Sequence, residues 1–172
     1  MAVREILLYP DPILKQVAAP ARVGEAEAVG RDLVETMRSF GRCVGLAAPQ
    51  LGELVRVIAV DVSEHPAAET SNGLLVLANP RITEAEGGEV AREGCLSIPD
   101  LTANVRRATR VVVEHADGRV ECRGFEARCV QHELDHLDGI LFLDRVDSLV
   151  DDVFRRKVYA DGSSPPSRPA ER

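Results

Sequence analysis

Two histidines with a glutamate between them form the segment of this sequence best suited to metal chemistry, His132-Glu133-Leu134-Asp135-His136. Residues four positions apart lie on the same face of a helix, so both imidazoles can bind one divalent metal ion. Glu133 would lie close to that ion without binding it, where its carboxylate can accept a proton from water. The chain contains only 4 histidines, and the presence of two of them in this motif favours a metal site over chance.

A catalytic metal site of this kind needs a third protein ligand and one position left open for water. In one class of zinc protease, the third ligand is the last histidine of the pattern H-E-x-x-H-x-x-G-x-x-H. The sequence fits that pattern through Gly139 but has Phe142 in place of the last histidine. This excludes the class, because phenylalanine cannot bind a metal. A downstream carboxylate, from Asp151 or Asp152, remains an alternative for a thermolysin-like arrangement.

Cys95 is the better candidate for the third ligand. It lies in Glu93-Gly94-Cys95-Leu96-Ser97, where the glycine allows the backbone to turn tightly toward a buried ion. A thiolate and two imidazoles would leave one coordination position open. The other two histidines, His65 and His115, stand in polar surroundings, and we expect them to be ordinary hydrogen-bonded side chains.

The length and composition are those of one globular domain. Of the 172 residues, 45% are hydrophobic and 28% are charged, and a net charge of −7 with scattered basic residues argues against a general nucleic-acid surface. We find no pattern typical of an export signal or a membrane span, so we expect a cytoplasmic protein with free or metal-bound cysteines. We expect the folded domain to span residues 1–160 and the Pro/Ser-rich segment 161–172 to be a disordered tail.

The spacing of apolar residues predicts the helices. The pair Asp11-Pro12 can start a short helix, and apolar residues at i, i+4, i+8 and i+11 predict a helix over 24–40. Similar spacing runs through residues 125–137, so the histidines continue the inward face of a helix that would stop at Gly139. A further apolar stripe predicts an amphipathic helix over about 149–158.

Apolar and β-branched runs bounded by turn residues predict strands over 54–62 and 74–77. Runs over 110–114 and 119–122 flank the turn Ala116-Asp117-Gly118 and predict a hairpin. Most of these strands precede the histidine helix. We therefore expect an α+β fold, with antiparallel or mixed sheets around that helix and the last amphipathic helix at the C-terminal end.

Three separate motifs give the chain a specific resemblance to the peptide deformylases. They are Gly45-Leu46-Ala47-Ala48-Pro49-Gln50, Glu93-Gly94-Cys95-Leu96-Ser97 and Gln131-His132-Glu133-Leu134-Asp135-His136, in this order. The resemblance covers the chain from Ile6 to about Ala160. It implies a metal-dependent hydrolase that removes the N-formyl group from the initiator methionine of nascent peptides and releases formate.

The resemblance also assigns roles to residues of the three motifs. The implied metal ligands are Cys95, His132 and His136. They would hold one divalent ion, typically Fe²⁺ in this family, with Zn²⁺, Ni²⁺ or Co²⁺ able to occupy the same site. Glu133 would accept the proton of the attacking water and deliver it to the leaving amine. The Gln50 side-chain amide and the Leu96 backbone N–H would stabilise negative charge on the formyl oxygen.

The resemblance further implies a pocket for the methionine side chain and a strand edge for the peptide. The implied pocket residues are Val44, Cys129 and the carbon faces of Glu93 and His132. The peptide that follows methionine would pair with Gly45 and the loop after Ser97, as in strand addition. The implied partners are N-formyl-methionyl peptides and the ribosome near its exit tunnel. We expect a monomer with no direct nucleic-acid or membrane site.

Two departures from the family pattern lie near the expected site. Cys43 stands where the family usually has glycine, and we hypothesise that it alters inhibitor binding or oxidation sensitivity. Thr102-Ala103-Asn104 stands where many relatives have aromatic or basic residues. The preference for residues beyond methionine is therefore open.

Two other functions also remain open from the sequence. A metallopeptidase with Asp151 or Asp152 as the third ligand would share the chemistry of Glu133 but cleave internal amides. A non-catalytic paralogue that binds formylated peptides, or a protein with a structural ion, would need neither Glu133 and Gln50 nor an open coordination position. The presence of these features favours the enzyme.

Overall fold

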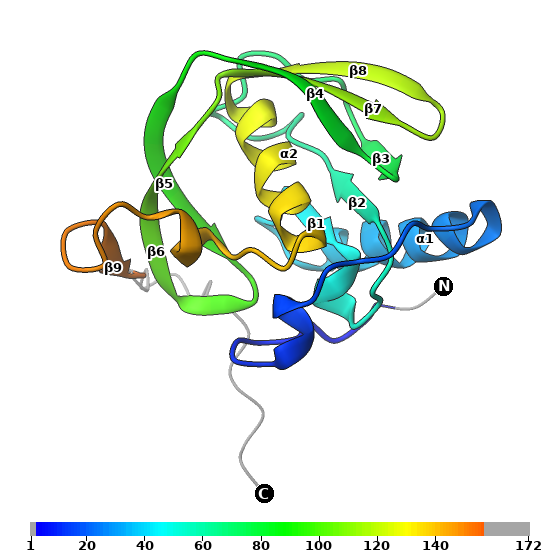
Figure 1. Cartoon of the computed structure of the whole chain (residues 1–172), viewed down its shortest axis with the longest axis horizontal. Coiled ribbons are helices and arrows are strands. Elements are labelled where there is room, and N and C mark those ends of the chain that lie inside the picture. Colours follow the sequence, from blue (N-terminus) through cyan, green and yellow to red (C-terminus); the bar gives the residue numbers. More distant parts are fainter. Residues whose placement is uncertain (1–2, 157–172) are drawn as a thin grey trace, which may run out of the picture.

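The computed structural model describes residues 3–156. Helix α2 is its central element, and three small antiparallel sheets surround this helix (Figure 1). The expected α+β class is confirmed. In chain order the elements are η1 (Pro12–Lys15), α1 (Val23–Ser39), β1 (Gly45–Ala47), η2 (Ala48–Leu51), β2 (Val57–Val60), β3 (Leu75–Ala78), β4 (Arg81–Glu86), β5 (Glu89–Cys95), β6 (Ile98–Arg107), β7 (Arg110–His115), β8 (Gly118–Arg123), α2 (Gly124–Leu137), η3 (Phe142–Arg145) and β9 (Val153–Arg155).

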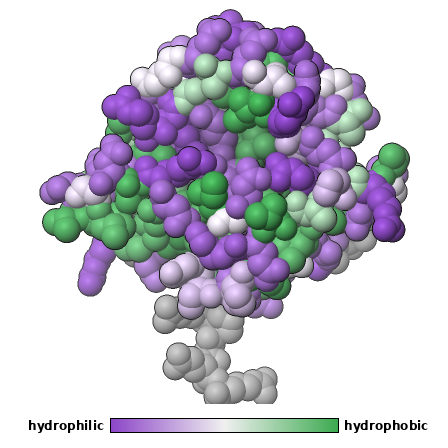
Figure 2. Space-filling model, in the orientation of Figure 1, coloured by the Kyte–Doolittle hydropathy of each residue, from purple (hydrophilic) through white to green (hydrophobic). Residues whose placement is uncertain are grey.

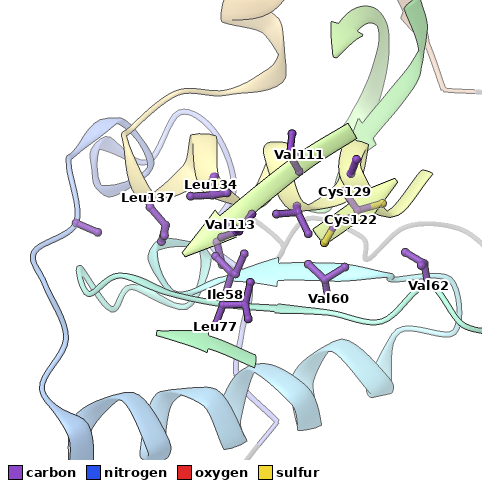
Figure 3. Close-up of a cluster of buried hydrophobic side chains, with 14 residues drawn as sticks. Ile58, Val60, Val62, Leu77, Val111, Val113, Cys122, Cys129, Leu134 and Leu137 are labelled. Atoms are coloured by element: carbon purple, nitrogen blue, oxygen red, sulfur yellow. The ribbon is translucent and has the colours of Figure 1, made fainter. Parts of the chain in front are cut away.

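The sheet with strand order β1-β2-β3 lies between the two long helices. Its strands are antiparallel, with Ile58 of β2 opposite Leu77 of β3. All four residues of β2 are buried, because α1 packs on one face of the sheet and α2 on the other. Figure 3 shows Ile58 and Leu77 on the side of the sheet that faces Leu134 and Leu137 of α2. The core thus holds α2 against a rigid support.

The other two sheets place further residues around α2. In the sheet β4-β7-β8, the last two strands form the hairpin that the sequence predicts. In the sheet β5-β6-β9, β5 and β6 form a long hairpin whose register shifts between Gly94 and Cys95. A bulge of this kind changes the direction of a side chain. Here it occurs at the residue that the sequence nominates as a metal ligand.

Both long helices agree with their predicted spans. Helix α1 buries Leu33 and Met37 against the first sheet, and α2 ends before Gly139, as predicted. Gly139 has a φ of 68°, which is strained for other residues, and a Cβ there would lie 2.7 Å from the backbone carbonyl of Lys15. Glycine is therefore required where the chain leaves the histidine helix.

The amphipathic helix predicted over about 149–158 is wrong for the residues that the structure describes. Leu149 and Val150 are 71% and 89% exposed in a turn, and Val153–Arg155 forms strand β9 at the edge of β6. Pairing with an open sheet edge outweighs the helical spacing, because a lone helix here would have no core for its apolar face. Residues 157–158 of this prediction, and the tail predicted for 161–172, lie outside the described residues.

Most large apolar side chains of the described chain are in three buried clusters around the sheets. The face drawn in Figure 2 is mainly hydrophilic, with hydrophobic residues in separate groups between polar ones. Within residues 3–156, no helix has the length and apolar composition needed to cross a membrane.

Candidate metal centre and active site

Cys95, His132 and His136 lie together where the β5–β6 hairpin meets α2. Their ligand atoms all lie within 4.8 Å of one another, and Cys95 Sγ is 3.3 Å from His136 Nε2. All three side chains are buried. Two imidazoles and one thiolate are donors that suit Zn²⁺ and neighbouring transition metals, and three protein donors leave a position open for a reactant. The residues therefore fit a catalytic metal ion.

Asp151 and Asp152, the alternative sources of a third ligand, make other contacts. Asp152 accepts hydrogen bonds from Asn104 Nδ2 and from the backbone N–H of Ser148, each at 3.2 Å. Asp151 accepts one from Ser148 Oγ at 2.8 Å. Neither carboxylate belongs to the group of metal donors found within the described chain. The structure therefore gives no support to the thermolysin-like arrangement.

The carboxylate of Glu93 orients the ring of His132. Glu93 Oε2 lies 2.9 Å from His132 Nδ1, so Nδ1–H donates to the carboxylate and Nε2 is left for a metal. Burial alone would raise the pKa of Glu93, but hydrogen bonds from His132 and Arg107 lower it to about 2. The family resemblance suggests only a pocket-lining carbon face for Glu93, and its orienting role has no signal in the sequence.

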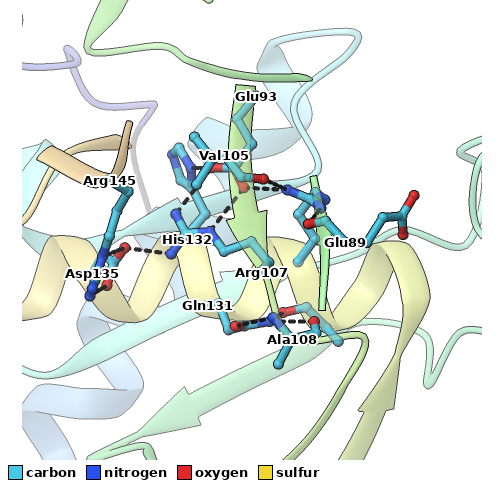
Figure 4. Close-up of polar contacts among 11 residues, drawn as sticks. Glu89, Glu93, Val105, Arg107, Ala108, Gln131, His132, Asp135 and Arg145 are labelled. Atoms are coloured by element: carbon cyan, nitrogen blue, oxygen red, sulfur yellow. Dashed lines mark hydrogen bonds and ion pairs between the residues drawn. The ribbon is translucent and has the colours of Figure 1, made fainter. Parts of the chain in front are cut away.

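Two buried arginines neutralise Glu93. Arg107 donates to its two carboxylate oxygens at 2.9 and 3.0 Å, and Arg128 donates to Oε1 at 2.9 Å. Arg107 also donates to Asp135 at 2.6 Å, and Asp135 accepts two further bonds from Arg145. Figure 4 shows this series of contacts between the hairpin and α2. Each buried charge has an opposite partner, and the network fixes the helix that carries the histidines.

Glu133 lies beside the metal donors and packs against β1. Its side chain is buried, and Oε2 has no hydrogen-bond partner within residues 3–156. A Cβ on Gly45 would lie 2.5 Å from Glu133 Oε1, so the carboxylate fits because residue 45 has no side chain. Burial raises the pKa of Glu133 to about 7, with Cys95 and Glu93 acting in the same direction and the two histidines opposing them. Such a carboxyl group can both accept and return a proton.

Gln50 is held with its amide nitrogen toward the metal donors. Its Oε1 accepts a hydrogen bond from the backbone N–H of Ala47 at 3.0 Å, and this bond fixes which end of the amide is the oxygen. Its Nε2 donates to Ser97 Oγ at 3.1 Å and lies 3.4 Å from Cys95 Sγ. Leu96, the other expected donor, follows Cys95 between β5 and β6. Leu96 and Gln50 both line a cavity beside the metal donors.

Cys95 and Cys43 both line this cavity but differ in acidity. Burial opposes ionisation of Cys95, yet His136 and His132 hold the pKa of its thiol well below the usual value. A thiolate is the form that binds metals. Burial raises the pKa of Cys43 to about 12, and its protonated thiol donates to the Gly45 carbonyl at 3.1 Å. The effect of Cys43 on inhibitor binding and oxidation stays a prediction.

A cavity of about 410 Å³ opens beside the metal donors and Glu133. Its lining includes all four residues expected to contact the substrate, namely Val44, Gly45, Glu93 and Cys129. It also includes His65 and Phe125, whose rings stack with centroids 4.1 Å apart. The sequence gives His65 no role, because a histidine outside a motif carries no local signal of what it will contact.

The comparison of the sequence with known proteins gives one family. The model of the family described as Polypeptide deformylase matches residues 3–152. The peptide deformylase of Thermodesulfovibrio yellowstonii is 42% identical over 164 residues, which cover 91% of this chain and 97% of that protein. The residues 3–152 that match the family model include every residue of the site described above.

Solved structures give the same result for the fold. A Met-Ala-Ser-bound class I type b peptide deformylase from Acinetobacter baumannii has a TM-score of 0.74 and 37% identity, covering 84% of this chain and 99% of that chain. The peptide deformylase of Thermotoga maritima has a TM-score of 0.74 and 35% identity, covering 86% of this chain and 100% of that chain. The chain therefore belongs to the polypeptide deformylase family.

Proposed function

We propose that the residues gathered around Cys95, His132 and His136 carry out the reaction of this family. As a member, the protein is a metal-dependent hydrolase that removes the N-formyl group from nascent peptides. The position of Glu133 is the observation that supports these residue roles most strongly. Its buried carboxylate has an oxygen without a partner in the described chain, beside three converging metal donors. A purely structural metal site needs no such group.

Cys95, His132 and His136 would hold one divalent metal ion, and we infer Fe²⁺ as the native ion from the family resemblance. When bound, the ion would supply Lewis acidity, which favours ionisation of water and negative charge on the formyl oxygen. The donor set fits a divalent transition metal of this kind, because two imidazoles and a thiolate accept Fe²⁺ as well as Zn²⁺, Ni²⁺ and Co²⁺. Glu93 would keep Nε2 of His132 directed at the ion.

Glu133 is the general base and then the general acid of the proposed reaction. Water loses a proton to the Glu133 carboxylate as its oxygen adds to the formyl carbon. Protonated Glu133 returns the proton to the amide nitrogen as the C–N bond breaks, which yields formate and a free amino terminus. The absence of a side chain at Gly45 supports these roles, because it leaves room for the Glu133 carboxylate beside the metal donors.

Gln50 Nε2 and the Leu96 backbone N–H would stabilise negative charge on the formyl oxygen. The bond from Ala47 to Gln50 Oε1 and the bond from Gln50 Nε2 to Ser97 hold the amide in place before substrate binds. A donor that is already in position needs no reorganisation when charge develops. Loss of one such donor typically costs about 3 kcal/mol of transition-state stabilisation.

The cavity beside Glu133 is the proposed pocket for the methionine side chain. Val44, Cys129 and the stacked rings of His65 and Phe125 provide apolar surface there. The relative from Acinetobacter baumannii, whose structure is described as Met-Ala-Ser-bound, supports a site for a peptide that begins with methionine.

The edge of β1 that does not face β2 would pair with the peptide backbone. The backbone N–H of Asp61 donates to the carbonyl of Val44. Backbone groups alternate in direction along an antiparallel strand, so those of Gly45 point away from β2. They are available to an added strand, and the Cys43 thiol bound to the Gly45 carbonyl would share or yield that acceptor.

The same proposal covers the setting in which the protein acts. All the proposed metal ligands come from one chain, which supports a monomer as the active form. Formylated amino termini emerge from the ribosome, so an enzyme in the cytoplasm near the exit tunnel would meet its substrate as it appears.

Formate release tests the proposed function. Purified protein supplied with Fe²⁺ or Ni²⁺, with oxygen excluded, should release formate from formyl-Met-Ala-Ser and leave the Met-Ala bond intact. Acetyl-Met-Ala-Ser is the matched control substrate, because its extra methyl group should be excluded near the crowded Glu133. A metallopeptidase would instead produce shorter peptides from both. Shorter peptides, or no formate from metal-loaded protein, would contradict the proposal.

A further inference from the structure

Two arginine side chains flank the substrate cavity beside the sheet β5-β6-β9. Arg92 belongs to β5, and Arg156 directly follows β9, which pairs with β6. Figure 1 shows β9 beside the hairpin of β5 and β6. Both arginines line the same cavity as Gly45 and Glu133. A peptide bound along Gly45 would therefore have them as neighbours.

Arg156 lies over Gly94, the residue before the expected ligand Cys95. A Cβ on Gly94 would collide with Arg156 Nη2, so the guanidinium occupies the space that a larger residue would fill. The backbone N–H of Arg156 is anchored by the carbonyl of Asp100 at 2.8 Å. Its Nε is buried and has no hydrogen-bond partner within residues 3–156. A buried donor without a partner is costly, and an acceptor brought by a ligand would satisfy it.

Arg92 is held in place by groups that carry no charge. Its guanidinium donates to Asn104 Oδ1 and to Thr102 Oγ1, each at 3.2 Å. Its central carbon lies 3.5 Å from the centroid of the Phe154 ring. These contacts restrict the side chain, but they leave its positive charge uncompensated.

The acidic residues of the cavity do not neutralise this pair. Glu93 is already bound to Arg107 and Arg128, and Glu133 lies beside the metal donors. Within the described chain, neither Arg92 nor Arg156 forms an ion pair with a carboxylate. The cavity therefore has positive charge beside the path proposed for the peptide.

We propose that Arg92 and Arg156 form a carboxylate-binding subsite that selects peptides with an acidic group one or two residues after formyl-methionine. This inference rests on the proposed function and adds a preference to it. A guanidinium binds a carboxylate through parallel N–H donors, which a lysine cannot reproduce. An Asp or Glu side chain and the terminal carboxylate of a short peptide both supply this chemistry.

Matched peptides test the preference with the full-length, metal-loaded protein. Formyl-Met-Ala-Xaa-Ala amides and formyl-Met-Xaa-Ala-Ala amides, with Glu, Gln or Lys at Xaa, carry no terminal carboxylate. We expect kcat/KM to be about three- to tenfold higher for Glu than for Lys in at least one series, mainly through KM. The ratio should shrink at high salt. Formyl-Met-Ala as the free acid, compared with its amide, tests the terminal carboxylate separately.

Variants show whether the two arginines cause the preference. In Arg92→Gln/Arg156→Gln the ratio of Glu to Lys peptides should approach one, whereas Arg156→Lys should keep part of it. The control double variant Arg81→Gln/Arg119→Gln has the same net charge as Arg92→Gln/Arg156→Gln. Arg81 and Arg119 lie outside the cavity. The control variant should keep the wild-type ratio. Thermal unfolding of each variant confirms that it is folded.

Calorimetry measures the affinity of the protein for the deformylated peptides and needs no turnover. Equal affinity and equal kcat/KM for the Glu, Gln and Lys peptides would overturn the subsite. A preference that survives loss of both arginines would also overturn it. If the Glu peptide binds more tightly but no peptide yields formate, the subsite stands and the proposed function fails.

Discussion

The carboxylate of Glu93 lies 2.9 Å from Nδ1 of His132 and determines which nitrogen of that ring faces the metal donors. Strand β5 thus carries both Cys95 and the group that orients a second ligand. Ligand geometry depends on this strand as much as on the histidine helix. The two elements are joined by Arg107, which binds Glu93 and Asp135 together.

The substitution Glu93→Gln should weaken metal binding. It removes the acceptor that orients His132 and leaves Arg107 and Arg128 buried without their carboxylate. We expect metal affinity to fall about 10- to 100-fold and the free energy of unfolding to fall by about 3 kcal/mol. Competition with a chelator measures the affinity. Glu89→Gln, at an exposed position of the same strand, should change neither quantity, and wild-type affinity in Glu93→Gln would refute the orienting role.

The same carboxylate should make the metal-free protein sensitive to acid. The pKa of Glu93 is about 2 in the folded protein against an ordinary value of 4.5, so the unfolded chain binds this proton more readily. The contribution is fully present above about pH 4.5 and is lost as the pH falls toward 2, an effect of about 3 kcal/mol. Urea unfolding at several pH values should show a smaller loss in Glu93→Gln. Equal losses in both proteins would show that Glu93 is not responsible.

Gly45→Ala should impair catalysis while leaving the fold intact. The new Cβ would lie 2.5 Å from Glu133 Oε1, so the carboxylate must move. A displacement of about 1 Å can cost about 10²-fold in rate, and we expect kcat to fall by that order. Gly41→Ala is the matched control, because nothing lies within 4 Å of its added Cβ. Steady-state kinetics distinguish the two, and equal kcat values would disprove the contact.

Gly139→Ala should destabilise the protein more than a comparable change at the other end of α2. Gly139 and Gly124 both have positive φ, at 68° and 53°, but only the Cβ of Gly139 would meet a backbone, at 2.7 Å from Lys15. We expect a loss of about 1 kcal/mol for Gly124→Ala from strain alone. Gly139→Ala should lose about 2 to 4 kcal/mol because overpacking is added. Denaturant unfolding measures both, and equal losses would contradict the packing argument.

Local patterns made much of the fold predictable. The spacing of apolar residues located α1 and α2, and the turn at Ala116-Asp117-Gly118 located the hairpin of β7 and β8. The long hairpin of β5 and β6 has no clear signal in the sequence, because β5 is mostly exposed and shows little apolar alternation. The sequence predicts a helix where β9 forms, because the pairing partner of β9, strand β6, is distant in the sequence.

In the site, too, residues in local motifs could be predicted, and residues brought together from distant positions in the sequence could not. The metal donors were predictable, since His132 and His136 share a helix face and Cys95 lies in a recognisable motif. Arg107 and Arg128 were not, because they are 14 and 35 residues from Glu93 and no local pattern links them. Arg156 was missed for the same reason, since only the path of β9 brings it to Gly94.

Bound metal and formate release, measured on the same samples of wild type and Glu133→Gln, test the role of Glu133 most directly. We expect one metal ion per chain in both proteins, because Cys95, His132 and His136 remain. We expect kcat for formyl-Met-Ala-Ser to fall about 10²- to 10⁴-fold in Glu133→Gln, and to be unchanged in Glu114→Gln, at an exposed position of β7. Full metal content with wild-type turnover in Glu133→Gln would contradict the proposed mechanism.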